Sequence, residues 1–247
     1  MNIRKHTTAN ENHCLVEEFE MKQARTLNDK ELNLLLLYIS TRKHAARDRA
    51  IVACTFFGGM RIGEVAATKI KDVLAADGTI KYEINLTAEQ TKGKYSRTVV
   101  LADKLRKEIQ IYLQTRFSTK QLIALTYSEH INKPLFKTQK SDGFSSNTLT
   151  YTMTMLYKAA GLNGCSSHSG RRSFLSTLSA KAVPLKVLME LAGHRQAQTT
   201  MQYISVTQDM KRGGCKKFCV NSHFAGNCYF QKWIKNDDTK SLTQRFN

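Results

Sequence analysis

The sequence predicts an α+β fold that is mainly helical and contains one small antiparallel β-sheet. Apolar residues recur at intervals of three and four in several segments, as they do on the buried face of a helix. Two other segments, 79–87 and 96–101, have the composition of strands, and a glycine lies in the run between them, which favours a β-hairpin. The 247 residues, 41% of them hydrophobic, suit a globular chain of one large domain or two small ones.

The helices are predicted from apolar stripes and from the residues at their ends. The first is expected after Thr26 and Asp29, which resemble a capping box although aspartate replaces the usual glutamate or glutamine. A second helix is expected over 45–57, where the apolar surroundings of Cys54 place that residue in the core. The stripe of the first helix comprises Leu32, Leu35, Leu36 and Ile39.

Two longer helices are expected in the middle of the chain, over 103–115 and about 146–160. Between them, residues 116–143 are expected to hold loops and a short strand at Leu135–Phe136. The apolar face of the first of these helices comprises Leu105, Ile109, Tyr112 and Leu113. That of the second comprises Leu149, Met153, Leu156 and Tyr157.

Charge and hydropathy limit the function and the location. Lysine and arginine exceed aspartate and glutamate by enough to give a net charge of +18, so we expect a polyanionic partner, nucleic acid first. The longest apolar run falls short of the roughly 20 residues that a membrane helix needs, and no apolar segment follows the first basic residues as in a secretory signal. We therefore expect a protein of the cytoplasm or nucleoid, where disulfides are not expected.

Residues 165–205 contain side chains that suit phosphate chemistry, namely His168, Arg171, His194 and Tyr203. Arginine binds phosphate oxygens with a fork of donors, histidine moves protons near neutral pH, and tyrosine can act as a nucleophile. His168 and Arg171 are three residues apart, so they share a face at the start of a helix. A further helix is expected between Pro184 and Gly193, with His194 just past its end.

Each of these residues also has a simpler interpretation, because an isolated His-x-x-Arg pair is usually solvated and a single tyrosine is usually half-buried core. The order and spacing of all four are far more specific. The motifs HSGRR and LAGH, followed by a tyrosine nine residues on, resemble the C-terminal signature of the tyrosine recombinases, the phage integrase family. The segments FFGGMRIGEV at 56–65 and TKGKYSRTVVL at 91–101 resemble its arginine box and its lysine hairpin. The resemblance covers about residues 25–206.

The resemblance implies a DNA breaking and rejoining catalytic domain over 25–206 and a role for each matching residue. Tyr203 would attack a DNA phosphorus to form a covalent 3′-phosphotyrosine, while Arg61 and Arg171 stabilise the charge on the phosphate oxygens. His194 would add a donor, and His168 would assist proton removal or hold the phosphate. The energy of the broken ester bond is kept in the new phosphotyrosine bond, so neither a nucleotide cofactor nor a metal is implied.

Three roles in this assignment have alternatives. Arg61 could simply form a salt bridge with Glu64, whereas the resemblance implies that Glu64 orients Arg61 toward a phosphate. Lys92 would protonate the departing 5′ oxygen, but Lys94 could replace it after a slip of the hairpin register. The arginines nearest the motifs, Arg97, Arg172 and Arg195, join Lys94 as expected DNA phosphate contacts, although each could be plain solvated surface. The partner implied is a double-stranded recombination site, bound by a homo-oligomer, from dimer to tetramer.

The two ends of the chain differ in composition from the rest. Residues 1–24 are polar and are expected to form a flexible arm, and 207–247 form a basic tail. The tail carries Cys215, Cys219, His223 and Cys228, which approach a zinc-knuckle spacing. Ordinary cysteines without metal are the simpler reading, and the tail's basic and aromatic residues would also suit nucleic-acid contact or packing on a neighbouring protomer.

Only the arm precedes the expected catalytic domain, whereas most of the family carries an N-terminal helical domain that closes around DNA. The chain therefore resembles small single-domain invertases or a truncated integrase. A second hypothesis is a non-catalytic DNA-binding regulator derived from a recombinase, which would bind DNA and ignore the loss of the tyrosine hydroxyl. A third is a type IB topoisomerase-like enzyme, which the HSGRR and LAGH motifs favour less.

Overall fold

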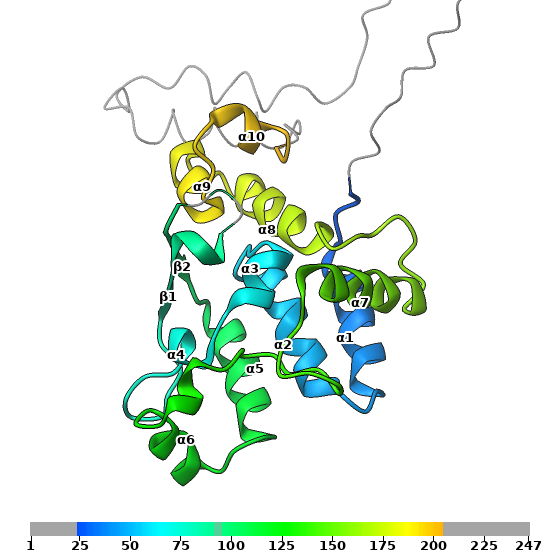
Figure 1. Cartoon of the computed structure of the whole chain (residues 1–247). Helices are drawn as coiled ribbons and strands as arrows, with labels where there is room; N and C mark the ends of the chain where they lie inside the picture. The colour runs from blue at the N-terminus through cyan, green and yellow to red at the C-terminus, as the bar shows by residue number, and fades with distance from the viewer. Residues whose placement is uncertain (1–23, 92, 94, 205–247) are drawn as a thin grey trace, which may run out of the picture.

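A computed structural model describes residues 24–91, 93 and 95–204, which form a mainly helical fold with one two-stranded antiparallel sheet (Figure 1). This confirms the predicted fold class. The helices of this part are α1 (Asp29–Ser40), α2 (Ala45–Phe56), α3 (Ile62–Ala67), α4 (Ile70–Val73), α5 (Asp103–Gln114), α6 (Thr119–Leu125), α7 (Ser146–Ala159), α8 (Ser169–Ala180), α9 (Leu185–Ala192) and α10 (Ala197–Met201). The strands are β1 (Glu83–Leu86) and β2 (Arg97–Val100), and the short 3-10 helices are η1 (Ala88–Gln90) and η2 (Glu129–Asn132).

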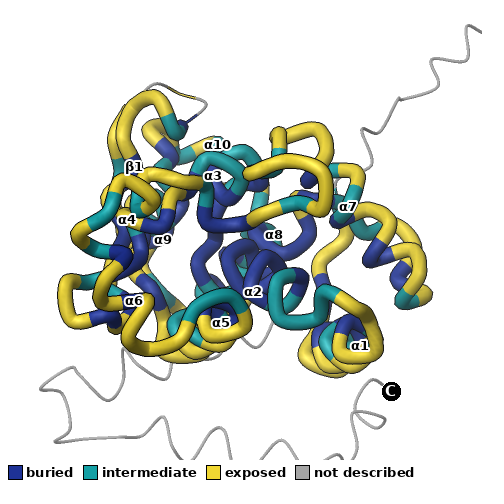
Figure 2. Tube along the Cα trace, turned by 60° about the horizontal axis from the view of Figure 1, so that its bottom comes forward, coloured by how far each residue is buried: buried dark blue, intermediate teal, exposed yellow. Residues whose placement is uncertain are grey.

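Helix α2 runs through the centre of the molecule and is buried along most of its length (Figure 2). All its residues from Ala50 to Phe56 are buried, and α1, α5 and α8 pack around it. A helix enclosed in this way can be apolar on every side. Cys54 is 2% exposed, as predicted for a core residue, and burial raises the pKa of its thiol to about 12.

The amphipathic helices bury the faces that their periodicity predicts. All the apolar residues expected on the inner face of α5 are buried, and the same holds for α7. The bounds of these helices agree with the expected ranges to within a residue, and Gly161 follows α7 with a positive φ of 74°. The main core therefore forms where apolar residues three and four apart face α2 and its neighbours.

The two strands form the predicted antiparallel hairpin, although both are shorter than expected. Glu83 pairs with Val100 and Leu86 with Arg97, while Ile84 faces the core. The residues before β1 do not extend the ladder, because Thr79 bonds to Asp77 in a turn and Ile80 makes an isolated bridge. The register places Arg97 at the end of the ladder beside α9, which packs against β2.

The start of the first helix differs from the prediction. The N-cap is Asn28, whose side chain accepts from the backbone N–H of Glu31 at 2.9 Å, and Glu31 accepts from the N–H of Asn28 at 3.0 Å. The expected pair, Thr26 and Asp29, was therefore wrong by two residues. Asparagine is at least as good an N-cap residue as threonine. Of the two candidates, only Asn28 is followed by a glutamate at the third helical position.

Two segments contain helices that were not predicted. Residues 116–143 include α6 and η2, and Leu135–Phe136 is not a strand, because only an isolated bridge joins Pro134 to Lys69. The polar run after His194 forms α10, a helix of 5 residues that packs on α9. Neither segment shows a long apolar stripe, so their helices depend on packing that the local sequence does not display.

Helices α8, α9 and α10 gather at one end of the molecule, opposite α6 (Figure 1). Helices α8 and α9 share a small cluster of buried residues, Leu175, Leu188 and Ala192, against which Tyr203 packs. None of the described helices is long and apolar enough to cross a membrane. The predicted N-terminal arm, apart from Ala24, and the predicted tail lie outside the described residues.

Candidate active site

Arg61 and Glu64 meet at the start of α3, as expected from their spacing. Arg61 is the N-cap residue, its backbone N–H donates to Oε2 of Glu64 at 2.8 Å, and its Nη1 donates to Oε1 at 3.0 Å. The Glu64 side chain is 1% exposed, whereas that of Arg61 is 30% exposed. The salt bridge and the orienting role are therefore compatible, because one edge of the Arg61 guanidinium is held while part of it stays accessible.

Arg97 is the second partner of Glu64, and its side chain is 8% exposed. Its Nε and Nη2 donate to the two carboxylate oxygens at 3.2 and 2.7 Å, and its Nη1 donates to the carbonyl of Leu191 at 2.8 Å. Burial by itself raises the pKa of Glu64, but the hydrogen bond and charge of Arg97, then the N–H of Arg61 and the charge of Arg171, lower it below the usual value. Glu64 is therefore ionised at neutral pH.

Arg171 lies deeper, 2% exposed, on the first turn of α8. Its guanidinium donates to the carbonyls of Gly59 and Ala192 and to Nε2 of His194 at 2.9 Å. Burial, followed by the charges of Arg61 and Arg97, lowers its pKa, yet a guanidinium keeps its proton at neutral pH. The preceding residue is glycine, and a Cβ there would collide with Thr55, so α8 can approach α2 closely.

The C-terminal end of α9 brings these arginines together. The consecutive carbonyls of Leu191, Ala192 and Gly193 accept from Arg97, Arg171 and Arg61 respectively, the last at a longer 3.5 Å. The last carbonyls of a helix lack partners within it and carry the negative end of the dipole, which suits cations. Gly193 ends α9 as predicted, with φ 61° and ψ 46°, and a Cβ at this position would lie 2.5 Å from Cδ of Arg97.

His194 follows directly and is 8% exposed. A guanidinium has no acceptor, so Nε2 of His194 must accept from Arg171. Nδ1 then carries the proton and donates to Oγ1 of Thr200 at 2.9 Å. Burial, then the charges of Arg171, Arg61 and Arg97, lowers the pKa of His194 to about 4, so the ring is neutral at pH 7. In this arrangement Nε2 has no hydrogen to offer a phosphate, in contrast to the donor role expected from the sequence.

Tyr203 also contacts this histidine. Its ring stacks on that of His194 with a centroid separation of 5.6 Å and an interplanar angle of 29°. Its backbone carbonyl accepts from Oγ of Ser176 at 2.9 Å. Arg171, His194 and Tyr203 therefore form a continuous row, although α8 and the residues after α10 supply its two ends.

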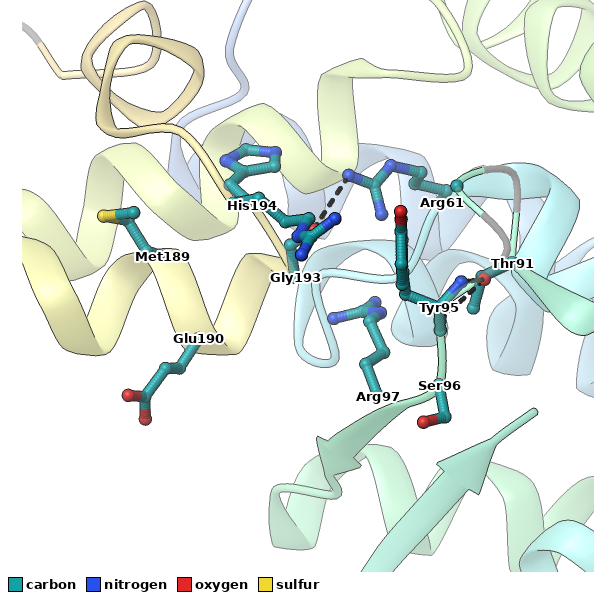
Figure 3. A pocket seen from close by; sticks show the side chains of 11 residues that line it. Arg61, Thr91, Tyr95, Ser96, Arg97, Met189, Glu190, Gly193 and His194 are labelled. Atoms are coloured by element: carbon teal, nitrogen blue, oxygen red, sulfur yellow. Dashed lines mark hydrogen bonds between the residues drawn. The ribbon is translucent and has the colours of Figure 1, made fainter. Parts of the chain in front are cut away.

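A cavity of about 610 Å³ opens between the hairpin and the end of α9 (Figure 3). Arg61 at the start of α3, Arg97 on β2 and His194 just past α9 line it. Tyr95 lines it from the hairpin tip, where the guanidinium of Arg195 lies 4.1 Å from the Tyr95 ring centroid. A hollow of this volume is in the range of small-molecule sites. Tyr203 instead lines a second hollow, of about 490 Å³, together with Arg25 and Arg172.

The predicted residues are thus only partly brought together. His168 is the exposed N-cap residue of α8 and is not among the residues lining the 610 Å³ cavity. Lys92 and Lys94 lie outside the described residues, while Gly93 between them lines the cavity. Arg195 is exposed, Arg172 is half-buried, and the side chain of Arg97 is 8% exposed. The possible zinc ligands Cys215, Cys219, His223 and Cys228 also lie outside the described residues.

Three residues at the site were not predicted. Thr200 accepts from His194, Ser176 donates to the Tyr203 carbonyl, and Tyr95 lines the cavity. Thr200 and Ser176 are short hydroxyl residues within ordinary helical sequence, and nothing in their spacing distinguishes them. Tyr95 is in the lysine segment, so its position near the site followed from that segment, but its orientation did not.

Comparison with known proteins identifies the family. The profile described as the phage integrase family matches residues 25–210. The chain is 30% identical over 168 residues to the tyrosine recombinase XerC of Treponema denticola, covering 66% of this chain and 53% of the relative. It is 27% identical over 194 residues to the tyrosine recombinase XerA of Thermococcus kodakarensis, covering 78% and 62%. The chain thus spans between half and two thirds of the length of these relatives.

The fold agrees with the sequence match. The crystal structure of XerA recombinase superimposes with a TM-score of 0.60 at 22% identity, covering 78% of this chain and 63% of that one. The residues matched by the family profile include the helices and the hairpin that surround the cavity. The chain belongs to the phage integrase family.

Proposed function

We propose that this chain is a site-specific recombinase or integrase that cuts and rejoins DNA strands through a covalent 3′-phosphotyrosine. The observation that carries the proposal is the row formed by Arg171, His194 and Tyr203 beside a cavity lined by Arg61. Fixed cations next to a phenol are what attack on a phosphodiester requires, because negative charge grows on the phosphate oxygens. Membership of the phage integrase family supports the same chemistry.

In the proposed reaction, the Tyr203 oxygen forms a bond to phosphorus as the bond from phosphorus to the 5′ oxygen breaks. The phenol proton leaves with assistance from His168, and the 5′ oxygen gains a proton from Lys92 or, failing that, Lys94. Arg61 and Arg171 bind the oxygens of the phosphate throughout. The 5′ hydroxyl of another strand then reverses these steps, so the reaction needs neither a nucleotide nor a metal.

The described conformation would be the state before DNA engages. Tyr203 stacks on His194 but does not line the 610 Å³ cavity, and Arg171 donates to the same histidine. A phosphate entering beside Arg61 would have to draw Arg171 from His194, and the residues after α10 would have to bring the phenol to it. The helix before Tyr203 has 5 residues, so this movement displaces little structure.

We propose double-stranded DNA as the partner, bound by more than one copy of the chain in the cytoplasm of the host cell. The net charge of +18 supports binding to a polyanion. One similar structure, with a TM-score of 0.56 at 25% identity, is that of the XerH site-specific recombinase bound to difH substrate, which supports a DNA partner. A dimer or tetramer on one recombination site is our expectation for the assembly.

Covalent trapping tests this proposal. The full chain is incubated with a pool of duplexes that carry randomised cores and strand nicks, so that cleavage releases a short fragment and rejoining is impossible. We expect DNA that remains attached to the protein in denaturing detergent, and none with Tyr203→Phe. DNA binding without any attached product would contradict the proposal and favour the non-catalytic regulator. An attached product that persists in Tyr203→Phe would contradict the assigned nucleophile.

A further inference from the structure

Arg97 differs from Arg61 in where its donors go, although both contact Glu64. Each of its guanidinium nitrogens has a protein partner: Nε and Nη2 bond to Glu64, and Nη1 bonds to the carbonyl of Leu191. Its side chain is 8% exposed, against 30% for that of Arg61. Three of the five N–H groups of Arg97 are therefore held by the protein, and they tie it to two other elements of the cavity.

We propose that Arg97 is a positioning residue that holds Glu64, and through it Arg61, and that it is not the DNA contact expected from the sequence. The inference rests on the proposed recombinase function, because the group being positioned is the proposed phosphate ligand Arg61. Arg97 joins β2, which follows the hairpin tip, to α3 through Glu64 and to the end of α9 through Leu191. The Arg97 side chain thus fixes the relative position of β2, α3 and the end of α9, which surround the cavity.

The geometry requires the fork of an arginine. Two parallel bonds fix the plane of the Glu64 carboxylate, and the third bond runs in another direction to α9. A lysine is a single point charge on a flexible stem and cannot make all three. The stem of Arg97 also packs where Gly193 has no side chain, so the site is fitted to this residue.

The charge of Arg97 also keeps Glu64 ionised in a buried place. The charged groups around this carboxylate are Arg61 from the start of α3, Arg97 from β2 and Arg171 from α8, with the neutral ring of His194 beyond them. Burial favours the protonated acid, and Arg97 is the strongest opposing influence. Without Arg97 we expect the pKa of Glu64 to rise, so that protonation releases Arg61 at a pH where the natural protein still holds it.

The experiment compares Arg97→Gln and Arg97→Lys with two matched variants in the full chain. Arg49→Gln removes an arginine that bonds to Glu108 in the same two-pronged way, at 3.1 and 2.6 Å, between α2 and α5 and away from the cavity. Arg195→Gln removes an exposed arginine at the cavity rim. Three quantities are measured: the salt dependence of binding to a generic duplex, the rate of covalent trapping against pH, and the free energy of unfolding against pH.

We expect Arg97→Gln to keep the salt dependence of the natural protein, whereas Arg195→Gln lowers the slope by about 1, the value of one lost phosphate contact. Covalent trapping by Arg97→Gln should be about 10²-fold slower, because Arg61 is no longer aligned, and the acid limb of its rate profile should move to higher pH. Arg97→Lys should regain part of the rate, and Arg49→Gln should leave the position of the limb unchanged.

A fall in the salt slope of Arg97→Gln equal to that of Arg195→Gln would overturn the inference, as would an unchanged rate or an unmoved acid limb. If the natural protein traps no DNA, the proposed function fails. The unfolding measurement still tests whether Arg97 holds Glu64 in its ionised form. A protein in which folding raises the pKa of a carboxyl becomes more stable as the pH falls through that pKa. The free energy of unfolding that Arg97→Gln lacks relative to the natural protein should therefore shrink on acidification. A deficit independent of pH would contradict the pairing.

Discussion

Arg171 and Tyr203 both contact His194, but the protein holds them in different ways. Arg171 is 2% exposed, sits on a helix of 12 residues and donates to the carbonyls of Gly59 and Ala192 as well as to His194. Tyr203 is half-buried and follows a helix of 5 residues. Its side chain stacks on His194, and its carbonyl accepts from Ser176.

The difference separates two requirements of the proposed reaction. Cations that stabilise a transition state act best when they are fixed in advance, and the end of α9 fixes them. A nucleophile that must move to the phosphate and later leave it is better placed on a short element with a small buried surface. We call Arg61, Arg97 and Arg171 at the end of α9 the arginine centre, and the described residues after α10, which carry Tyr203, the tyrosine segment. We expect changes in the arginine centre to affect both folding and chemistry. Changes in the tyrosine segment should affect chemistry more than folding.

The largest effect is expected from Arg171→Lys. The carbonyls of Gly59 and Ala192 would lose their donor inside the protein, which should lower the free energy of unfolding by about 4 kcal/mol and slow covalent trapping by about 10³-fold. Urea unfolding and single-turnover trapping measure the two. Tyr203→Phe should abolish trapping yet change the free energy of unfolding by less than about 1 kcal/mol. If Arg171→Lys and Tyr203→Phe lost the same free energy of unfolding, Arg171 and Tyr203 would not differ in their importance for folding.

Acid should weaken the arginine centre through His194. Its pKa is about 4 in the folded protein, below the usual value of 6.5, so the neutral ring stabilises the fold above the usual pKa and that stability is lost as the pH falls toward 4. We expect the natural protein to lose about 2 kcal/mol more than His194→Gln between pH 7 and pH 4. Parallel curves for the two proteins in urea titrations at a series of pH values would show that His194 is not the group responsible.

A smaller effect is expected at Thr200, a residue of α10 whose hydroxyl accepts a hydrogen bond from His194. Thr200→Val keeps the shape but leaves the Nδ1 hydrogen of His194 without its acceptor, at a cost of about 1 to 2 kcal/mol. The ring should then be less well oriented, and trapping should slow by about 10-fold. Thr200→Ser keeps the hydroxyl and should restore most of the rate. If serine and valine behave alike in trapping assays, the hydrogen bond does not position the ring.

The smallest effect is expected from Ser176→Ala, which removes the hydrogen bond to the Tyr203 carbonyl. Stability should fall by about 0.5 to 1 kcal/mol. Because the bond holds the tyrosine segment in its resting place, the trapping rate should change by less than about 10-fold. Hydrogen exchange of the amides near Tyr203 should increase while that of α8 stays unchanged. Equal protection in both proteins would show that Ser176 does not hold the segment.

The helices predicted from the sequence are those that carry an apolar stripe or clear end signals of their own. Leu105, Ile109 and Tyr112 lie on one face of α5 at helical spacing, and Pro184 and Gly193 mark the ends of α9. Helix α10 was missed, because its polar run has no stripe and its stability comes from packing on α9. Local periodicity therefore recovers an element only when that element carries its own apolar face.

The candidate site divides in the same way. Arg61, Arg171, His194 and Tyr203 belong to motifs, and the family they resemble was identified from the sequence alone. The burial of Arg97 could not be predicted, because its partners are a glutamate on another element and a backbone carbonyl that has no sequence signature. The tautomer of His194 likewise depends on Thr200 and Arg171 acting together. Such contacts arise only when separate elements pack.

The central claim is that the phenol of Tyr203 reaches a phosphate held by the arginines at the end of α9. The direct measurement is mass spectrometry of the peptide that carries trapped DNA after digestion of the protein and the duplex. It distinguishes Tyr203 from Tyr95, whose ring lines the cavity in the described conformation. We predict the nucleotide remnant on Tyr203 alone. A remnant on Tyr95, or on any other residue, would contradict the account.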